Sequence, residues 1–109
     1  MKKAIIVSAI IVLAGVIGAS AADAKENWEK NCAKCHGADG AGKTKMGEKL
    51  GVKDYTDAKV QAEMKNDEMF KAIKEGVKKD DATKMKAFGD LLSDDEIKAL
   101  VAYVRGLKK

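Results

Sequence analysis

The sequence predicts an all-α domain with long irregular connections, and three observations support this. No segment alternates apolar and polar residues over enough positions to predict a strand. Two stretches rich in helix-forming residues are separated by glycines at positions 37, 40, 42, 47 and 51, through which no helix can run. The last stretch of the chain carries both a helix start signal and a helix stop signal.

The earlier elements are predicted from composition and from residues that break helices. A first helix is expected from Glu26 to Cys35, followed by a glycine-rich loop from Gly37 to Asp54. Helical composition returns over residues 57–75, with Asn66–Asp67 as a break and a new N-cap and Gly76 as the stop. The residues expected to point inward in this stretch are Val60, Met64, Phe70 and Ile73.

The final helix has the most complete signals. Ser93 followed by Glu96 forms a capping box, in which each side chain bonds the backbone N–H of the other residue. Leu92 and Ile97 form a hydrophobic staple around it, and Gly106 ends the helix. One apolar face at helical spacing follows: Ile97, Leu100, Val101 and Val104.

The N-terminus is typical of an export signal. Lys2 and Lys3 precede an uncharged, mostly aliphatic run, and small-x-small cleavage patterns end at Ala21 and at Ala24. We expect residues 1–24 to be a cleaved signal peptide and residues 25–109 to be a single domain. The alternative is an uncleaved membrane anchor, because 19 uncharged residues approach the length of a spanning helix. Both interpretations place the domain outside the cytoplasm.

The composition of residues 25–109 excludes several classes of protein. Nineteen basic and 16 acidic residues are interspersed, and no block of charge resembles a nucleic-acid-binding arm. Two cysteines and one histidine in 109 residues exclude a multi-bridge disulfide framework and a four-ligand zinc site made of Cys and His alone. A domain this small and lean in large apolar residues cannot form a large enzyme core, and is expected to need a bound cofactor, metal or disulfide for stability.

The candidate chemistry lies in the sequence Cys32-Ala33-Lys34-Cys35-His36. This spacing allows both sulfurs to bond covalently to the two vinyl groups of one haem while the histidine ligates the iron. A thioredoxin-like dithiol would need a βαβ context, and a zinc site would need ligands that the chain lacks. A simple Cys32–Cys35 disulfide is chemically feasible outside the cytoplasm, but it would give His36 no role. The motif therefore favours one covalently bound haem c.

The sequence resembles the small, single-haem class I cytochromes c over nearly all of residues 25–109. The motif at 32–37 is that family's signature, and Trp28 occupies the position of an aromatic that packs on the last helix through positions matching Leu100 and Tyr103. The segment 84–89, leading into the last helix, is similar to the family's axial-methionine segment. The resemblance implies a cytochrome c fold: three to five helices wrapped around one covalently attached haem, with the terminal helices packed together.

A second iron ligand is expected among four methionines. Met64 and Met69 lie in predicted helices, where methionine is usually core filler, and Met46 lies only ten residues after His36 and so stays on the His36 side of the haem. Met85 lies 49 residues beyond His36, far enough to reach the opposite face, and it occupies the family position. We therefore predict His36 and Met85 as the axial ligands.

Two departures from the family concern proline. The family usually has proline in the loop after the histidine and after the axial methionine, but this chain has none, and Lys86 follows Met85. The first absence obscures which carbonyl accepts the His36 N–H bond, and the second suggests a looser methionine loop. Tyr55 is either a hydrogen-bond donor to a haem propionate or a turn tyrosine with its ring on the core.

Six-coordinate His/Met iron has no open position, so the resemblance implies an electron carrier and not an enzyme. The enzymatic alternative, a haem peroxidase or small-ligand sensor with Met85 off the iron, lacks a second histidine as distal acid–base group. Expected partners are other redox proteins in transient contact, and no nucleic acid; a membrane is expected only if the N-terminal segment is uncleaved. Lys34, Lys84 and Lys86 either form a basic rim that attracts acidic partners or are scattered surface residues. The sequence is thus interpreted as a monomeric, periplasmic bacterial protein.

Overall fold

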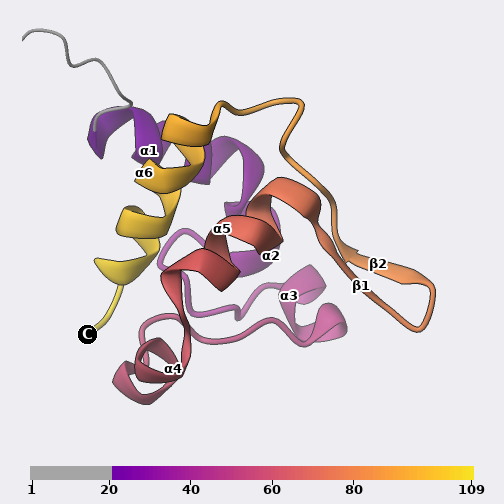
Figure 1. Ribbon diagram of the computed structural model, residues 1–109. Helices are drawn as coiled ribbons and strands as arrows, with labels where there is room; N and C mark the ends of the chain where they lie inside the picture. Colours follow the sequence, from indigo (N-terminus) through magenta and orange to yellow (C-terminus); the bar gives the residue numbers. More distant parts are fainter. Residues whose placement is uncertain (1–20) are drawn as a thin grey trace, which may run out of the picture.

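The computed structural model describes residues 21–109, which form six helices and one two-stranded antiparallel sheet (Figure 1). In chain order the elements are α1 (Ala21–Asn31), α2 (Ala33–His36), α3 (Lys45–Leu50), α4 (Ala58–Glu63), α5 (Asn66–Glu75), β1 (Val77–Lys79), β2 (Ala82–Met85) and α6 (Asp94–Arg105). Residues 1–20, most of the predicted signal peptide, lie outside the described residues. Residues 21–24 form the first turn of α1. Over 21–109, no helix has the length and apolar character needed to cross a bilayer.

The terminal helices pack against each other, as the sequence predicts. Trp28 on α1 is 2% exposed, and its ring lies 5.6 Å from the ring of Tyr103 on α6. Leu100 and Ile97, the most deeply buried large side chains of α6, belong to the same core cluster as Trp28. The capping box is also confirmed, because Ser93 Oγ accepts the Glu96 N–H and the Glu96 carboxylate accepts the Ser93 N–H.

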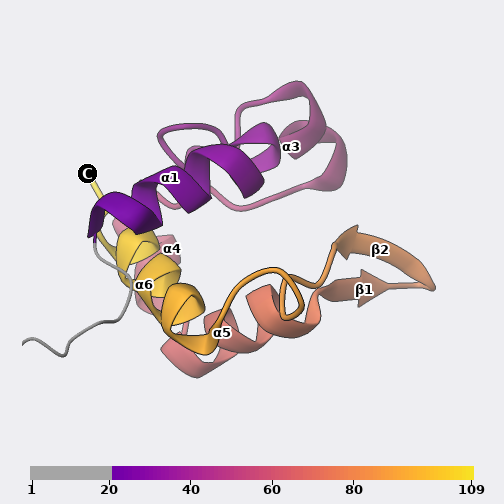
Figure 2. The same ribbon diagram turned by 90° about the horizontal axis from the view of Figure 1, so that it is seen from above.

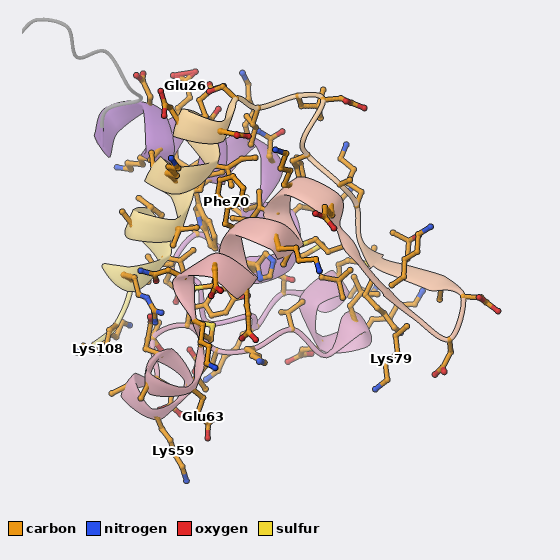
Figure 3. All side chains as sticks on the ribbon, viewed as in Figure 1. Glu26, Lys59, Glu63, Phe70, Lys79 and Lys108 are labelled. Carbon is orange, nitrogen blue, oxygen red and sulfur yellow. The ribbon has the colours of Figure 1, made fainter. Side chains whose placement is uncertain are left out.

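The elements form two layers with α6 at one end (Figure 2). One layer contains α1, α2, α3 and the glycine-rich loop, and the other contains α5 and the β1–β2 hairpin. Helix α6 contacts both layers through α1 and α5. Charged side chains such as Lys59 and Lys108 point away from the body (Figure 3).

Several predicted boundaries are wrong. The expected helix 26–35 is two helices, α1 and α2, with Cys32 as N-cap of the second. The expected loop 37–54 contains α3, which begins because the Thr44 hydroxyl accepts the Gly47 N–H at 2.8 Å. Six helices replace the expected three to five, because short capped turns count as separate helices.

The predicted break at Asn66–Asp67 lies slightly too late. Met64 and Lys65 have extended backbone conformations, and Asn66 is already the first residue of α5. Lys65 is the N-cap residue, although its side chain makes no capping hydrogen bond. The true break has no capping side chain at the N-cap position, so the usual sequence signal is missing.

The β1–β2 hairpin contradicts the expectation of no strand. Its strands pair Val77 with Met85 and Lys79 with Ala82, with an irregularity after Val77. Strands of three and four residues are too short for a period-two pattern to be recognised. Its two-residue turn is Asp80-Asp81, both with positive φ (53° and 65°), whereas hairpin turns of this kind favour Asn-Gly.

Candidate functional site

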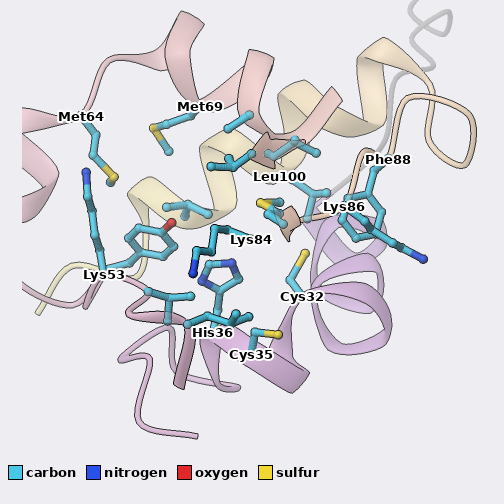
Figure 4. Close-up of a pocket in the computed structure, with 18 of the residues that line it drawn as sticks. Cys32, Cys35, His36, Lys53, Met64, Met69, Lys84, Lys86, Phe88 and Leu100 are labelled. Atoms are coloured by element: carbon cyan, nitrogen blue, oxygen red, sulfur yellow. The ribbon is translucent and has the colours of Figure 1, made fainter. Parts of the chain in front are cut away.

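A cavity of about 1160 Å³ lies between the two layers. Its floor is apolar, built from buried residues of α5, α6 and the segment between the hairpin and α6. Figure 4 shows Cys32, Cys35 and His36 on one side of it and Met64 and Met69 on the other. The buried apolar residues that line it are Trp28, Ile73, Phe88, Leu100 and Val104. Such a volume admits a large flat ligand once its own side chains adjust.

The two cysteines of the motif line this cavity with free thiols. Cys32 is 7% exposed, whereas Cys35 is half-buried. Burial, with a smaller contribution from the neighbouring Cys35, raises the pKa of the Cys32 thiol to about 11. Cys32 is therefore a neutral thiol at neutral pH.

His36 is buried between two aromatic rings. Its ring centroid lies 5.6 Å from that of Trp28 and 5.3 Å from that of Tyr55, which stacks on it. Burial lowers the pKa of His36, which favours the neutral imidazole that binds metals. Its Nδ1 is buried and makes no hydrogen bond to a described residue. A buried nitrogen without a partner is the kind of group that a bound ligand or ion explains.

Backbone hydrogen bonds and close packing hold the Cys35–His36 segment in place. The Thr44 hydroxyl donates to the Cys35 carbonyl at 2.7 Å, and the Gly42 N–H donates to the His36 carbonyl at 2.8 Å. A Cβ at Gly47 would overlap the Cys35 carbonyl oxygen, so only glycine allows α3 to approach this closely. Thr44 was not singled out by the sequence, although its position directly before Lys45-Met46 is a weak N-cap signal.

The four candidate methionines are placed differently from one another. Met85, at the end of β2, is half-buried and lines the cavity. Met64 and Met69 pack against the core cluster, as the sequence predicts, and they also line the cavity. Met64 follows α4 in an extended conformation instead of lying within a helix. Met46 lies in α3 and not in a loop; it is 37% exposed and does not line the cavity.

The donor set of this cavity fits a haem better than a bare metal ion. Two free thiols and a neutral imidazole lie at one side, three thioethers line other parts of the wall, and the rest is largely apolar. Within residues 21–109, no three His, Cys, Asp or Glu side chains are grouped closely enough to hold a metal ion. An iron brought by a haem needs only one or two of these side chains as ligands.

Comparison with known proteins agrees with this fold. The chain is a small c-type cytochrome. It belongs to the family described as "Cytochrome C oxidase, cbb3-type, subunit III", which matches residues 19–104. A search of curated proteins gives no match.

Two solved structures are similar to the chain over most of its length. The "KustC0563 c-type cytochrome" is 36% identical, with a TM-score of 0.70, and the match covers 79% of this chain and 98% of that one. A tyrosine-to-phenylalanine mutant of Kustc0563 is also 36% identical, with a TM-score of 0.68 and coverage of 79% and 99%. The expectation of a cytochrome c-type fold, made from the sequence, is thereby confirmed.

Proposed function

We propose that this chain binds one haem c covalently and carries single electrons between redox partners outside the cytoplasm, its iron cycling between Fe(II) and Fe(III). The observation that supports this best is the shared cavity. Cys32, Cys35 and His36 line one side of it (Figure 4), and Met85, at the end of β2, lines the same cavity. Family membership supports the same function, since a c-type cytochrome implies covalently bound haem c.

The two cysteines are the proposed attachment points. In each thioether, an S–H adds across a vinyl C=C, so that sulfur bonds to one carbon and the hydrogen is transferred to the other. No oxidant or reductant is consumed, provided that both thiols are reduced. A Cys32–Cys35 disulfide would therefore block the reaction until it is reduced.

His36 and Met85 are the proposed axial ligands. When bound, the haem supplies a one-electron couple at iron. His36 is suited to its part because burial keeps it neutral. The soft Met85 thioether and the apolar cavity both favour the ferrous state over the more highly charged ferric state, and so raise the reduction potential.

An electron carrier fits these residues better than an enzyme does. With His36 and Met85 on the iron, no position is open to a substrate, and His36 is the only histidine in the sequence. Cytochrome c family members are generally electron carriers. A carrier needs only a small, transient contact at the edge of its cofactor.

The proposed partners are redox proteins with an acidic docking face. Seven lysines and three acidic residues line the cavity and its rim, whereas the rest of residues 21–109 holds 12 basic and 14 acidic residues. The excess positive charge therefore surrounds the cavity, including the three lysines predicted to form a rim: Lys34, Lys84 and Lys86. Two haem propionates would offset part of this charge, so we expect moderate attraction.

Ionic strength tests this docking surface. Lys84→Gln with Lys86→Gln should slow electron transfer to an acidic partner and weaken its dependence on salt. Lys59→Gln with Lys108→Gln is the matched control, because both lysines are exposed and neither lines the cavity. Equal rates in all three proteins, or rates independent of salt, would contradict the rim.

We further propose that residues 1–24 are a signal peptide, that residues 25–109 act as a monomer in a bacterial periplasm, and that no nucleic acid is involved. The uncharged run in residues 4–22 and the cleavage patterns after it support export. The intact mass of the exported protein tests this. A chain beginning at Lys25 or Ala22 would confirm cleavage, whereas the full chain would indicate an anchor.

The experiment that tests the function is a visible absorption spectrum of the exported protein, oxidised and reduced, before and after denaturing extraction of free haem. Sharp reduced bands, haem that survives extraction and a far-red ferric methionine–iron band are expected. Cys32→Ser with Cys35→Ser should lose the haem on extraction. Haem without the far-red band would favour a ligand-binding or peroxidase function, and absence of haem from the unmodified protein would overturn the proposal.

A further inference from the structure

One edge of the cavity is built from two segments that share no element. Tyr55 belongs to the loop before α4, and Met64 belongs to the connection between α4 and α5; both line the cavity and are half-buried. In Figure 4 the Met64 side chain reaches into the pocket at the end away from Cys32 and Cys35. Neither segment is part of a sheet or long helix, so something else has to fix their positions.

Gln61 joins these segments to the C-terminal helix from within the core. It is a polar residue only 6% exposed, at a depth where a glutamine side chain requires partners. Its amide nitrogen donates to the Tyr55 carbonyl at 2.7 Å and to the Val104 carbonyl at 2.8 Å. A single side chain thus holds the loop before α4 against α6.

Arg105, at the end of α6, holds the other segment. Its guanidinium donates to the Gln61 carbonyl at 2.6 Å, to the Gln61 side-chain oxygen at 3.1 Å and to the Met64 carbonyl at 2.6 Å. A fourth hydrogen bond reaches the Asn66 side chain at 2.9 Å, at the start of α5. Only a planar, fork-shaped donor can serve acceptors spread over six residues in this way.

Arg105 acts through the geometry of its hydrogen bonds and not through an ion pair. Lys74 and Asp94 form an ion pair, whereas Arg105 forms no salt bridge to a carboxylate within residues 21–109. All four of its acceptors are neutral amide oxygens. The arrangement is therefore one of geometry: the guanidinium sets the distance between α6 and the turn that follows α4.

We propose that Arg105 and Gln61 are positioning residues that fix the Tyr55–Met64 edge of the cavity and, through it, the reduction potential of the bound haem. This inference rests on the proposed function. With the edge loosened, water reaches the cofactor more easily, which favours ferric iron and lowers the potential. Neither residue touches the cavity contents: Arg105 and Gln61 are absent from its lining.

The test measures the midpoint potential, the melting temperature and the NMR signals of the Tyr55 ring and the Met64 methyl group in four proteins beside the unmodified one. Arg105→Lys keeps the charge but loses the fork, Arg105→Gln loses both, and Gln61→Met removes the amide at nearly constant volume. Lys98→Gln, an exposed change on the same helix, is the control.

We expect a lower potential and broadened or shifted Tyr55 and Met64 signals in Arg105→Lys and in Gln61→Met, with neither effect in Lys98→Gln. If the potential falls only in Arg105→Gln, Arg105 affects the haem through its positive charge and not by positioning the cavity edge. A lower melting temperature with unchanged potential and signals would make the network purely structural. Either result overturns the inference. If the unmodified protein carries no haem, the proposed function fails, and the NMR signals still decide whether the network positions this edge.

Discussion

The two sides of the cavity that supply the proposed iron ligands are held very differently. On the histidine side, formed by α2, α3 and the loop between them (residues 33–50), two hydrogen bonds from outside α2 and one glycine contact hold the carbonyls of Cys35 and His36. On the methionine side, formed by the β1–β2 hairpin (residues 77–85), residues 77–83 are all exposed. No side chain of that hairpin makes a hydrogen bond to another described residue.

This difference predicts that the fold itself positions His36, and that Met85 depends more on ligation for its position. His36 is held by the hydrogen bond to its carbonyl and by the rings of Trp28 and Tyr55. Met85 pairs with Val77 in the hairpin, and Gly76 approaches its carbonyl closely. The chain after it is held where the Phe88 N–H donates to the Ile73 carbonyl and the Gly89 N–H to that of Lys74. We therefore expect changes on the histidine side to affect folding, and changes in the hairpin to affect ligation.

The largest effect is expected from Trp28→Ala, which breaks the histidine side. Trp28 is buried, donates to the Gly37 carbonyl at 3.0 Å and packs on the rings of His36 and Tyr103. Removing so large a buried side chain typically costs about 3–5 kcal/mol of unfolding free energy. Urea unfolding measures it. Trp28→Phe is the control. It should lose about 1 kcal/mol of unfolding free energy for the missing hydrogen bond, and a little more for the smaller ring. Equal losses in the two variants would contradict this account.

Gly47→Ala should break the same side by a different route. The added Cβ overlaps the Cys35 carbonyl oxygen, and α3 has to move away from α2 at a cost of about 3 kcal/mol. The measurement is again unfolding free energy, together with the yield of haem-containing protein. Gly51→Ala is the control for Gly47→Ala, because no atom lies near the added Cβ and only the positive φ of 72° causes strain. We expect it to lose about 1 kcal/mol of unfolding free energy. If Gly51→Ala were the more damaging change, close packing at Gly47 would not be the reason.

Met85→Leu should separate ligation from folding. Leucine conserves the volume, so the change in unfolding free energy of the protein without haem should stay below about 1.5 kcal/mol. The ferric methionine–iron band should disappear and the reduction potential should fall, because the thioether is lost. Absorption spectra and a redox titration measure these. Met69→Leu and Met64→Leu are the controls; loss of the band in either of them, with retention in Met85→Leu, would reassign the ligand.

The smallest effect is expected from Asp81→Gly, which strengthens the hairpin. Asp81 has a φ of 65°, a conformation that glycine adopts without steric cost. Relief of strain, partly offset by the greater freedom of glycine in the unfolded chain, should leave a gain of about 0.5 kcal/mol. Added imidazole should then displace Met85 about twofold less readily. Asp81→Ala removes the charge but keeps the strain, so an equal gain there would point to charge instead of conformation.

Local signals made parts of this structure predictable. The capping box and the apolar face of α6 lie within a few residues of each other in the sequence, and the structure has both. The haem-type motif was identified in the same way, whereas the pairing of Trp28 with the last helix came from the family resemblance. Where the signals are weak, prediction failed: Thr44 as an N-cap, the break at Met64–Lys65 and the short hairpin all lack a strong local pattern.

The sequence by itself determined the class of this protein, because the cysteine–histidine spacing and the cap of the last helix depend only on residues close in the chain. The tertiary structure decided how the cavity is closed. Gln61 and Arg105 look like ordinary polar residues in the sequence, and their roles arise only because α6 returns to within hydrogen-bond distance of segments more than 35 residues earlier. Contacts between distant segments leave no periodic signal, since each depends on the position of every element between them.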